Sequence, residues 1–159
     1  WRRGLQEHPE HAGRFTGEPA YFKHVLGATQ LILSETNYSP KDFKFAVFHM
    51  PNGKFPVLAA KKLGFSMEQL KPGLVVEKIG NTYSGSSLLG LSAVLDVAKA
   101  GDKILVTSYG SGSGSDSFVF TASKRLEEVQ GKAKKTADYI ARKEFVGYAK
   151  YRQHMEMVV

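Results

Sequence analysis

The sequence of 159 residues contains no cysteine. This absence excludes disulfide bonds, thiolate-bound zinc or iron–sulfur clusters, and any thiol nucleophile supplied by the chain itself. A chain without cysteine is compatible with a reducing compartment, and we expect a cytoplasmic protein.

Long apolar runs are missing as well. No run approaches the roughly 18 residues that a membrane-spanning helix needs, and Trp1-Arg2-Arg3 is not followed by the apolar stretch of a secretory signal. We therefore expect no membrane partner. The chain also lacks an initiator methionine, so we expect that it begins partway through a longer protein.

Positive charge exceeds negative charge, with 22 Lys and Arg against 15 Asp and Glu and a formal net charge of +7. Residues 121–159 hold nine basic and five acidic side chains, and therefore +4 of this total. Their densest run, Lys132-Ala133-Lys134-Lys135, is too short for a nucleic-acid patch, which favours a solvated surface and no nucleic-acid partner. With 42% hydrophobic and 23% charged residues, the chain has the composition of one globular domain.

Periodicity predicts helices alternating with strands. The expected helices cover residues 16–35, with Thr16 as a cap and Pro19 in the first turn, then 55–63, a short helix from 66, 84–98, and a helical or irregular segment over 137–153. The expected strands cover residues 43–48, 103–108 and 117–121, with 75–79 extended. Residues 84–98 are apolar nearly all round, which predicts a buried helix. This order predicts an α/β layered fold with a mixed sheet.

His49 has the most informative context of the five histidines. It follows an apolar strand and precedes Pro51-Asn-Gly-Lys54, which places an imidazole where a strand meets a loop. Strand ends in α/β sheets are where sites form, and histidine is suited to proton transfer near neutral pH. The alternative is a histidine that only bonds a loop carbonyl.

Two glycine-rich segments are further candidates. In Gly80-Asn-Thr-Tyr-Ser-Gly-Ser-Ser87, Asn81 offers an amide donor beside a helix N-terminus, although Ser84 or Thr82 could simply cap that helix. Gly110-Ser-Gly-Ser-Gly-Ser-Asp116 resembles a phosphate loop, but a strand rather than a helix follows, which excludes the dinucleotide-binding and P-loop motifs. This second segment could form an oxyanion hole or a flexible hairpin tip.

A metal site is not expected. His8-Pro-Glu-His11 has a gap that could suit a metal, but no third His, Cys or paired carboxylate stands nearby at ligand spacing.

The motifs occur in an order that resembles the C-terminal half of the thiolase superfamily. They are His49-x-Pro-Asn-Gly-Lys54, Ile79-Gly-Asn-Thr-Tyr-Ser-Gly-Ser86 and Ser108-Tyr-Gly-Ser-Gly112. With Arg14-Phe-Thr-Gly-Glu-Pro-Ala-Tyr21, Lys54-Phe-Pro56 and Tyr148-Ala-Lys-Tyr-Arg152, the chain is similar over essentially its whole length to the hydroxymethylglutaryl-CoA synthase family in its archaeal form. The resemblance implies a thiolase-like layered αβα fold, with residues 1–159 as the C-terminal half.

The resemblance also implies a reaction and roles for individual residues. The reaction condenses acetyl-CoA with acetoacetyl-CoA and water through a cysteine and a glutamate of an N-terminal half that is absent from this chain. The implied roles are general acid for His49, hydrogen bonding to a substrate oxygen for Asn81, an oxyanion-stabilising backbone N–H for Ser111, attraction of CoA for Lys54, and substrate proximity for Arg14 and Thr16. Leu58 departs from the family, where a basic residue is expected, and Lys61 or Lys62 would only partly replace it.

Partners are implied in the same way. They are the chain's own N-terminal half, a second copy in a homodimer, acetoacetyl-CoA thiolase, and a small zinc-ribbon/OB-fold scaffold protein. No cofactor is expected beyond the CoA thioester substrates. The alternatives are a ketoacyl synthase III-like condensing enzyme and a non-catalytic scaffold subunit of thiolase fold.

Overall fold

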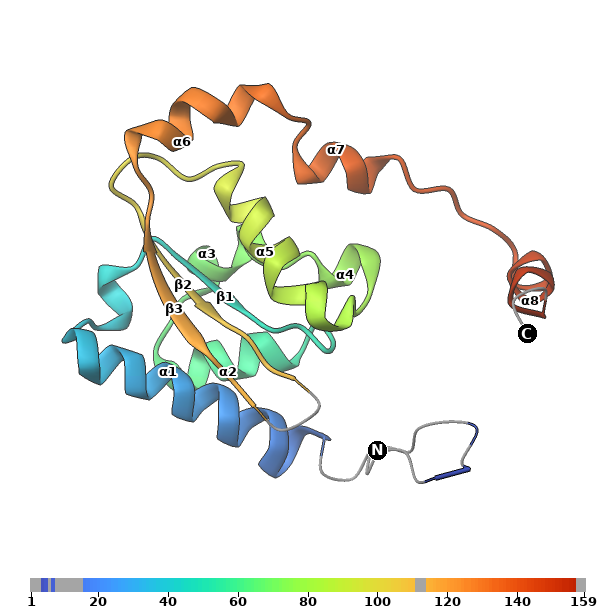
Figure 1. Ribbon diagram of the computed structural model, residues 1–159, viewed down its shortest axis with the longest axis horizontal. Helices are drawn as coiled ribbons and strands as arrows, with labels where there is room; N and C mark the ends of the chain where they lie inside the picture. Colours follow the sequence, from blue (N-terminus) through green and yellow to red (C-terminus); the bar gives the residue numbers. More distant parts are fainter. Residues whose placement is uncertain (1–3, 6, 8–15, 111–113, 157–159) are drawn as a thin grey trace.

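The computed structural model describes residues 4–5, 7, 16–110 and 114–156 (Figure 1). A three-stranded sheet stands between two layers of helices, with α1 and α2 against one face and α5 against the other. The elements are α1 (Phe22–Thr36), β1 (Phe45–Phe48), α2 (Phe55–Leu63), α3 (Met67–Leu70), α4 (Val76–Ile79), α5 (Ser86–Leu95), β2 (Lys103–Thr107), β3 (Ser117–Thr121), α6 (Lys124–Val129), α7 (Thr136–Ala141) and α8 (Tyr148–Glu156).

The sheet is mixed, as predicted. β1 pairs in parallel with β2, from Phe45 opposite Ile104 to Phe48 opposite Thr107, and β2 pairs antiparallel with β3. All four residues of β1 are buried because helices cover both of its faces. The layered αβα arrangement and all three strands are therefore confirmed, each strand within two residues of its expected bounds.

Alternation along the strands divides the core into two main clusters. Ala46, Phe48 and Leu105 face α1 and α2, where Tyr21, Val25 and Ala59 complete the packing. The intervening residues Phe45, Val47, Ile104 and Val106 face α5, where they meet Val94 and Ala98. A strand with period-two side chains thus contributes to both clusters.

The first helix begins later than the sequence predicts. α1 starts at Phe22 with Tyr21 as its N-cap residue, so Thr16 is not the cap of this helix. Glu18 interrupts residues 16–21 with an extended conformation, φ −113° and ψ 128°. The cause is local, because the ring of a proline disfavours the helical conformation in the residue before it.

Residues 76–79 were expected to be extended but form α4. The Gly80 amide closes this short helix by donating to the Val76 carbonyl at 2.8 Å, and Gly80 itself has φ +74°. Four residues with an apolar side chain at each end are equally compatible with a strand and with a helical turn, so periodicity could not decide between them.

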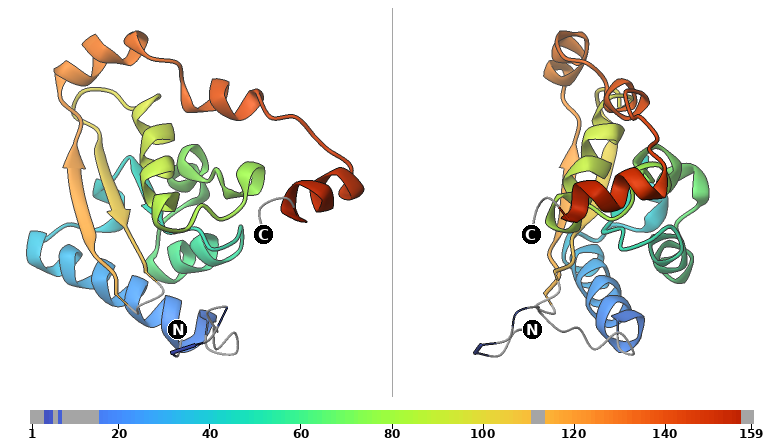
Figure 2. Two further views of the ribbon diagram at one scale, coloured as in Figure 1. Left: turned by 45° about the vertical axis from the view of Figure 1, so that its right-hand side comes forward. Right: turned by 90° about the vertical axis from the view of Figure 1, so that its right-hand side faces the viewer.

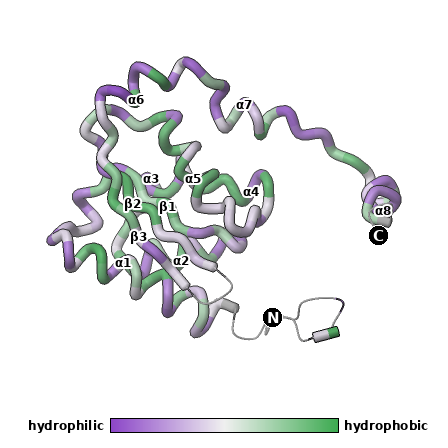
Figure 3. Tube along the Cα trace, in the orientation of Figure 1, coloured by the Kyte–Doolittle hydropathy of each residue, from purple (hydrophilic) through white to green (hydrophobic). Residues whose placement is uncertain are grey.

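The expectation of a fully buried helix over 84–98 is corrected in two respects. α5 is shorter than the expected range, and it is buried along one side only. The buried residues are Ser86, Ser87, Gly90 and Val94, whereas Leu88 is 66% exposed. Figure 3 shows the apolar character of α5 along its length. A helix that is apolar all round becomes fully buried only when other elements cover it on every side. In the described chain the sheet covers one side of α5, so its other sides stay partly exposed.

The C-terminal residues run along and then beyond the core. α7 is anchored to α5 because the Thr136 amide donates to Asp96 Oδ2 at 2.6 Å. An extended segment then carries α8 away from the sheet (Figures 1 and 2). The predicted helical or irregular character of residues 137–153 is confirmed, as two short helices separated by residues 142–147.

Candidate active site

His49 lies directly after β1, and its backbone is held from two sides. Its N–H donates to the Thr107 carbonyl at 2.9 Å, which continues the pairing with β2. Its carbonyl accepts a hydrogen bond from the hydroxyl of the fully buried Tyr21 at 2.8 Å. Only 6% of His49 is exposed, so the imidazole is fixed at the carboxyl end of the strand.

The ring of Tyr109 lies close to the imidazole of this histidine. The ring of Tyr109, which follows β2, lies 5.8 Å from the His49 ring and 5.5 Å from the Tyr21 ring. Burial lowers the pKa of the His49 imidazole below its usual value of 6.5, because desolvation disfavours the charged form. Burial raises the pKa of the Tyr21 hydroxyl, which therefore stays protonated and remains a donor.

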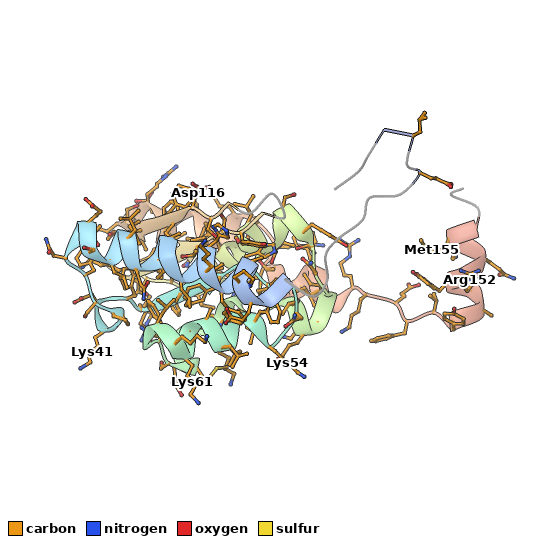
Figure 4. The ribbon with its side chains drawn as sticks, turned by 90° about the horizontal axis from the view of Figure 1, so that it is seen from below. Lys41, Lys54, Lys61, Asp116, Arg152 and Met155 are labelled. Carbon is orange, nitrogen blue, oxygen red and sulfur yellow. The ribbon has the colours of Figure 1, made fainter. Side chains whose placement is uncertain are left out.

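The turn after His49 starts α2. Asn52 Oδ1 accepts hydrogen bonds from the amides of Lys54 at 2.9 Å and Phe55 at 3.0 Å, so it satisfies two free donors at the helix start. This side chain orders the turn, and Lys54 extends into solvent at its end (Figure 4).

The basic residues near Leu58 differ in their surroundings. Leu58 is 46% exposed at the surface of α2. Lys62 Nζ pairs with Glu18 Oε1 at 3.1 Å and lies 5.0 Å from the Phe22 ring centre, whereas Lys61 is an exposed cation. Of the two lysines considered as substitutes for a basic residue at position 58, Lys62 already has an acidic partner.

Asn81 begins a tight turn before α5. Its Oδ1 accepts a hydrogen bond from the Tyr83 amide at 2.8 Å, and Tyr83 has a positive φ of 50°. With the oxygen used inside the turn, the Nδ2 amide is the part of this side chain suited to donate to a substrate oxygen.

A buried hydrogen bond connects this turn region to the histidine strand. Ser86 Oγ, 1% exposed at the start of α5, accepts from the Met50 amide at 2.9 Å, one residue after His49. Close packing of Gly90 on Val47 brings the two elements together, since a Cβ on Gly90 would lie 2.6 Å from Val47 Cγ1. The structure thereby joins the two motifs that the sequence separates by some thirty residues.

The third motif leaves β2 at the same end of the sheet. The Ser108 amide donates to the Asp116 carbonyl at 2.8 Å, and Ser115 Oγ donates to the Ser108 carbonyl at 2.7 Å. The segment after it continues as β3, which confirms that it is not a phosphate loop. Ser111 and Arg14 lie outside the described residues, as do His8 and His11, and the structure describes the backbone of Thr16 but not its side chain.

Tyr21, Ser86 and Tyr109 are site residues to which the sequence analysis gave no role. Tyr21 and Ser86 stand inside quoted motifs, yet their partners lie 28 and 36 residues away. Tyr109 also stands inside a quoted motif, as the aromatic residue between β2 and a glycine-rich loop. Their contacts follow from the packing of α1 and α5 on opposite faces of the sheet.

The described residues form neither a metal-binding cluster nor a membrane-spanning helix. In residues 16–110 and 114–156, with the short described pieces before them, no three His, Asp or Glu side chains gather as metal ligands. None of the helices in that part of the chain has both the length and the apolar composition needed to traverse a bilayer.

Comparison of sequences identifies the family. Residues 33–122 match the family described as 3-oxoacyl-[acyl-carrier-protein (ACP)] synthase III C terminal. Hydroxymethylglutaryl-CoA synthase from Methanocella arvoryzae is 56% identical over 154 residues, which are 97% of this chain and 44% of the relative. The enzyme from Methanopyrus kandleri is 54% identical over 95% of this chain and 43% of its own length. The chain thus spans less than half the length of these curated relatives.

Solved structures give the same fold. MvaS in complex with 3-hydroxy-3-methylglutaryl coenzyme A matches 98% of this chain and 46% of its own, with a TM-score of 0.79 and 21% identity. HMG-CoA synthase complexed with CoA matches 96% of this chain and 42% of its own, with a TM-score of 0.77 and 26% identity. 3-Oxoacyl-(acyl carrier protein) synthase III from Pseudomonas aeruginosa matches 72% of this chain and 36% of its own, with a TM-score of 0.63 and 19% identity. The chain belongs to the family of the 3-oxoacyl-[acyl-carrier-protein] synthase III C-terminal domain, within the thiolase superfamily of condensing enzymes, and in that family it is similar to the archaeal hydroxymethylglutaryl-CoA synthases.

Proposed function

We propose that this chain is the C-terminal half of a hydroxymethylglutaryl-CoA synthase of the mevalonate pathway. The whole enzyme condenses acetyl-CoA with acetoacetyl-CoA and water to give hydroxymethylglutaryl-CoA and CoA. The observation that carries the proposal is the Ser86–Met50 hydrogen bond, which joins the start of α5, the helix that follows the Asn81 turn, to the residue after His49. Identity above 50% to archaeal synthases over nearly the whole chain supports the same assignment.

The N-terminal half supplies the covalent chemistry in this proposal. A cysteine there carries the acetyl group as a thioester, and a glutamate removes a proton from its methyl group. The resulting carbanion forms the carbon–carbon bond to the ketone of acetoacetyl-CoA, and the ketone oxygen becomes an alkoxide. Water then hydrolyses the thioester, which releases the product and restores the thiol.

In this proposal, the residues of this chain interact with the oxygen atoms of the substrate and of the intermediates. His49 donates a proton to the alkoxide, Asn81 Nδ2 donates a hydrogen bond to a substrate oxygen, and the Ser111 amide stabilises the tetrahedral oxyanion. Burial lowers the pKa of His49, which disfavours the protonated form that a general acid needs. A carboxylate from the other half would raise that pKa toward neutrality and favour the protonated form.

Other residues and partners belong to the same proposal. Lys54, exposed at the start of α2, attracts the phosphates of CoA as a mobile point charge, and Arg14 and Thr16 lie near bound substrate. The chain works with its own N-terminal half, forms a homodimer in the cytoplasm, and associates with acetoacetyl-CoA thiolase and a zinc-ribbon/OB-fold scaffold protein. CoA thioesters are substrates, and no cofactor is required.

The test combines this chain with its complementary half and measures thiol release from acetyl-CoA plus acetoacetyl-CoA. We expect His49→Ala to lower the rate by about 100-fold or more, because general acid catalysis contributes that much. His154→Ala, an exposed histidine on α8, is the matched control and should retain the rate. A full rate in His49→Ala would contradict the general-acid role.

Product analysis by mass spectrometry separates the ketoacyl synthase alternative. A synthase of the proposed kind releases free hydroxymethylglutaryl-CoA. A product formed from malonyl groups, without hydroxymethylglutaryl-CoA, would overturn the proposed function.

A further inference from the structure

The segment 142–156, here called the arm, leaves the body of the molecule after α7. Figures 1 and 2 show α8 at the end of an extended stretch, apart from the sheet and its helices. Five of its apolar or aromatic side chains are strongly exposed: Phe145 at 89%, Val146 at 50%, Tyr148 at 76%, Tyr151 at 49% and Met155 at 49%. An ordinary surface segment does not gather this much apolar surface within eleven residues.

The apolar residues of α8 share one face. Tyr148, Tyr151 and Met155 stand three, then four residues apart, and the two tyrosine rings lie 6.3 Å from each other. Lys150 and Gln153 project from the opposite side of the helix. This is the pattern of a helix that lays an apolar face into a groove of a partner.

Helix stability leads to the same expectation. α8 has nine residues, and an isolated helix shorter than about 12–15 residues is marginal in water. The ring contact within α8 and the bond from the Tyr151 amide to the Gly147 carbonyl, 3.0 Å, are local to the arm. Packing of the apolar face against another surface would supply the stability that local contacts do not.

The coverage and length of the related proteins indicate which polypeptide supplies the surface against which α8 packs. The family shared with synthase III matches residues 33–122, before the arm, and the synthase III structure covers 72% of the chain. The structure bound to 3-hydroxy-3-methylglutaryl coenzyme A covers 98% of this chain, arm included, within a polypeptide more than twice as long. The curated archaeal relatives are more than twice as long as this chain, so further polypeptide is available to cover the exposed apolar face, and the placement of the arm away from the body leaves room for it.

We propose that the arm is a clasp whose apolar helix face, formed by Tyr148, Tyr151 and Met155, docks into an apolar groove on the N-terminal half. This inference depends on the proposed function only in that such a half exists. The arm carries four basic and two acidic residues, a net +2, so the groove has acidic residues at its rim. Phe145 and Val146 enter the same interface as the extended part of the clasp.

The test measures the association of this chain with the N-terminal half and does not depend on catalysis. The chain is co-expressed with a tagged N-terminal half, its own or that of the Methanocella arvoryzae relative, and the affinity of the recovered halves is measured. We expect the double variant Tyr148→Ser/Tyr151→Ser to weaken association by about tenfold or more, since buried tyrosines are typical hot spots. The matched control is Lys150→Ser/Gln153→Ser on the opposite face, which should stay within about twofold.

Each outcome decides the proposal. Equal affinity for the tyrosine variant and the wild type overturns it, as does a homo-oligomer of this chain alone that requires the two tyrosines. Amide hydrogen exchange over residues 148–156 gives a second readout that does not depend on the variant, because docking must protect α8 in the assembled protein. An assembled but inactive complex would contradict the proposed function and leave the clasp intact.

Discussion

At the residue scale, the sequence predicts the position of His49 at a strand end but does not predict its tertiary contacts. Its place between a β-run and a proline turn follows from local pattern. The bond from Tyr21 to its carbonyl and the nearby Tyr109 ring require α1 and β2 to be in place. The role of His49 in proton transfer stays a prediction, whereas its burial at the strand end is a property of the structure.

The buried imidazole predicts how stability depends on pH. The folded-state pKa of His49 lies below the usual 6.5, so on acidification the unfolded chain takes up this proton first. Stability is therefore lost as the pH falls from about 6.5 through the folded pKa. Thermal unfolding of the wild type and of His49→Gln, measured from neutral to mildly acidic pH, should show a smaller loss in the variant.

The control for this measurement is His154→Gln, because His154 is exposed on α8. Its midpoint should follow the wild type across the same range. A His49→Gln variant that loses stability as steeply as the wild type would show that His49 does not titrate with a lowered pKa.

At the element scale, the packing of α5 on β1 decides the geometry between the two motifs. A Cβ on Gly90 would lie 2.6 Å from Val47 Cγ1 and 3.0 Å from the Gly73 carbonyl oxygen, a backbone atom with little freedom to move. We expect Gly90→Ala to lower the free energy of unfolding by about 1–3 kcal/mol, because overpacking forces the helix away from the strand. Urea unfolding measures this change.

Gly27→Ala on α1 is the matched control. It is also a glycine inside a helix, but nothing lies within 4 Å of the added Cβ. The better helix propensity of alanine should raise stability by up to about 1 kcal/mol. If both variants changed stability equally, close packing of α5 on β1 would not be the cause.

Elements differ in how far sequence determines them. The three strands follow from β-formers bounded by turn residues, and helix α2 from its apolar spacing with Gly64 at its end. The predictions for α4 and for the start of α1 were wrong. The four residues of α4 are too few to distinguish a strand from a helical turn, and the proline at position 19 alters the conformation of the residue before it. These errors concern short segments, where local preferences are weak.

At the scale of the whole molecule, the described chain leaves apolar surface exposed on α5 and on the outer strand β3. Leu88 on α5 is 66% exposed, and Phe118 and Phe120 on the outer strand β3 are 49% and 42% exposed with stacked rings. Full burial of such a side chain is worth about 1.5–3 kcal/mol. This surface suits a protein that is completed by further polypeptide.

Exposed apolar surface predicts a property of the chain by itself. We expect it to bind a hydrophobic dye such as ANS and to unfold at low urea concentration, because large apolar side chains on α5 and β3 are open to water. Addition of the complementary half should lower the dye fluorescence and raise the urea midpoint. Unchanged fluorescence in the assembled protein would show that these side chains are not covered by that half.

The sequence by itself determined the family, the order of the three motifs, the strands of the mixed sheet, and the absence of any thiol from this chain. These properties depend on residue types, spacing and local preferences, which are present in the linear chain. Only the tertiary structure decided that Tyr21 holds His49, that Ser86 joins two motifs, and that α8 stands apart with an apolar face. Contacts between residues 28 and 36 positions apart arise from how helices pack on a sheet, and packing is a property of the folded chain as a whole.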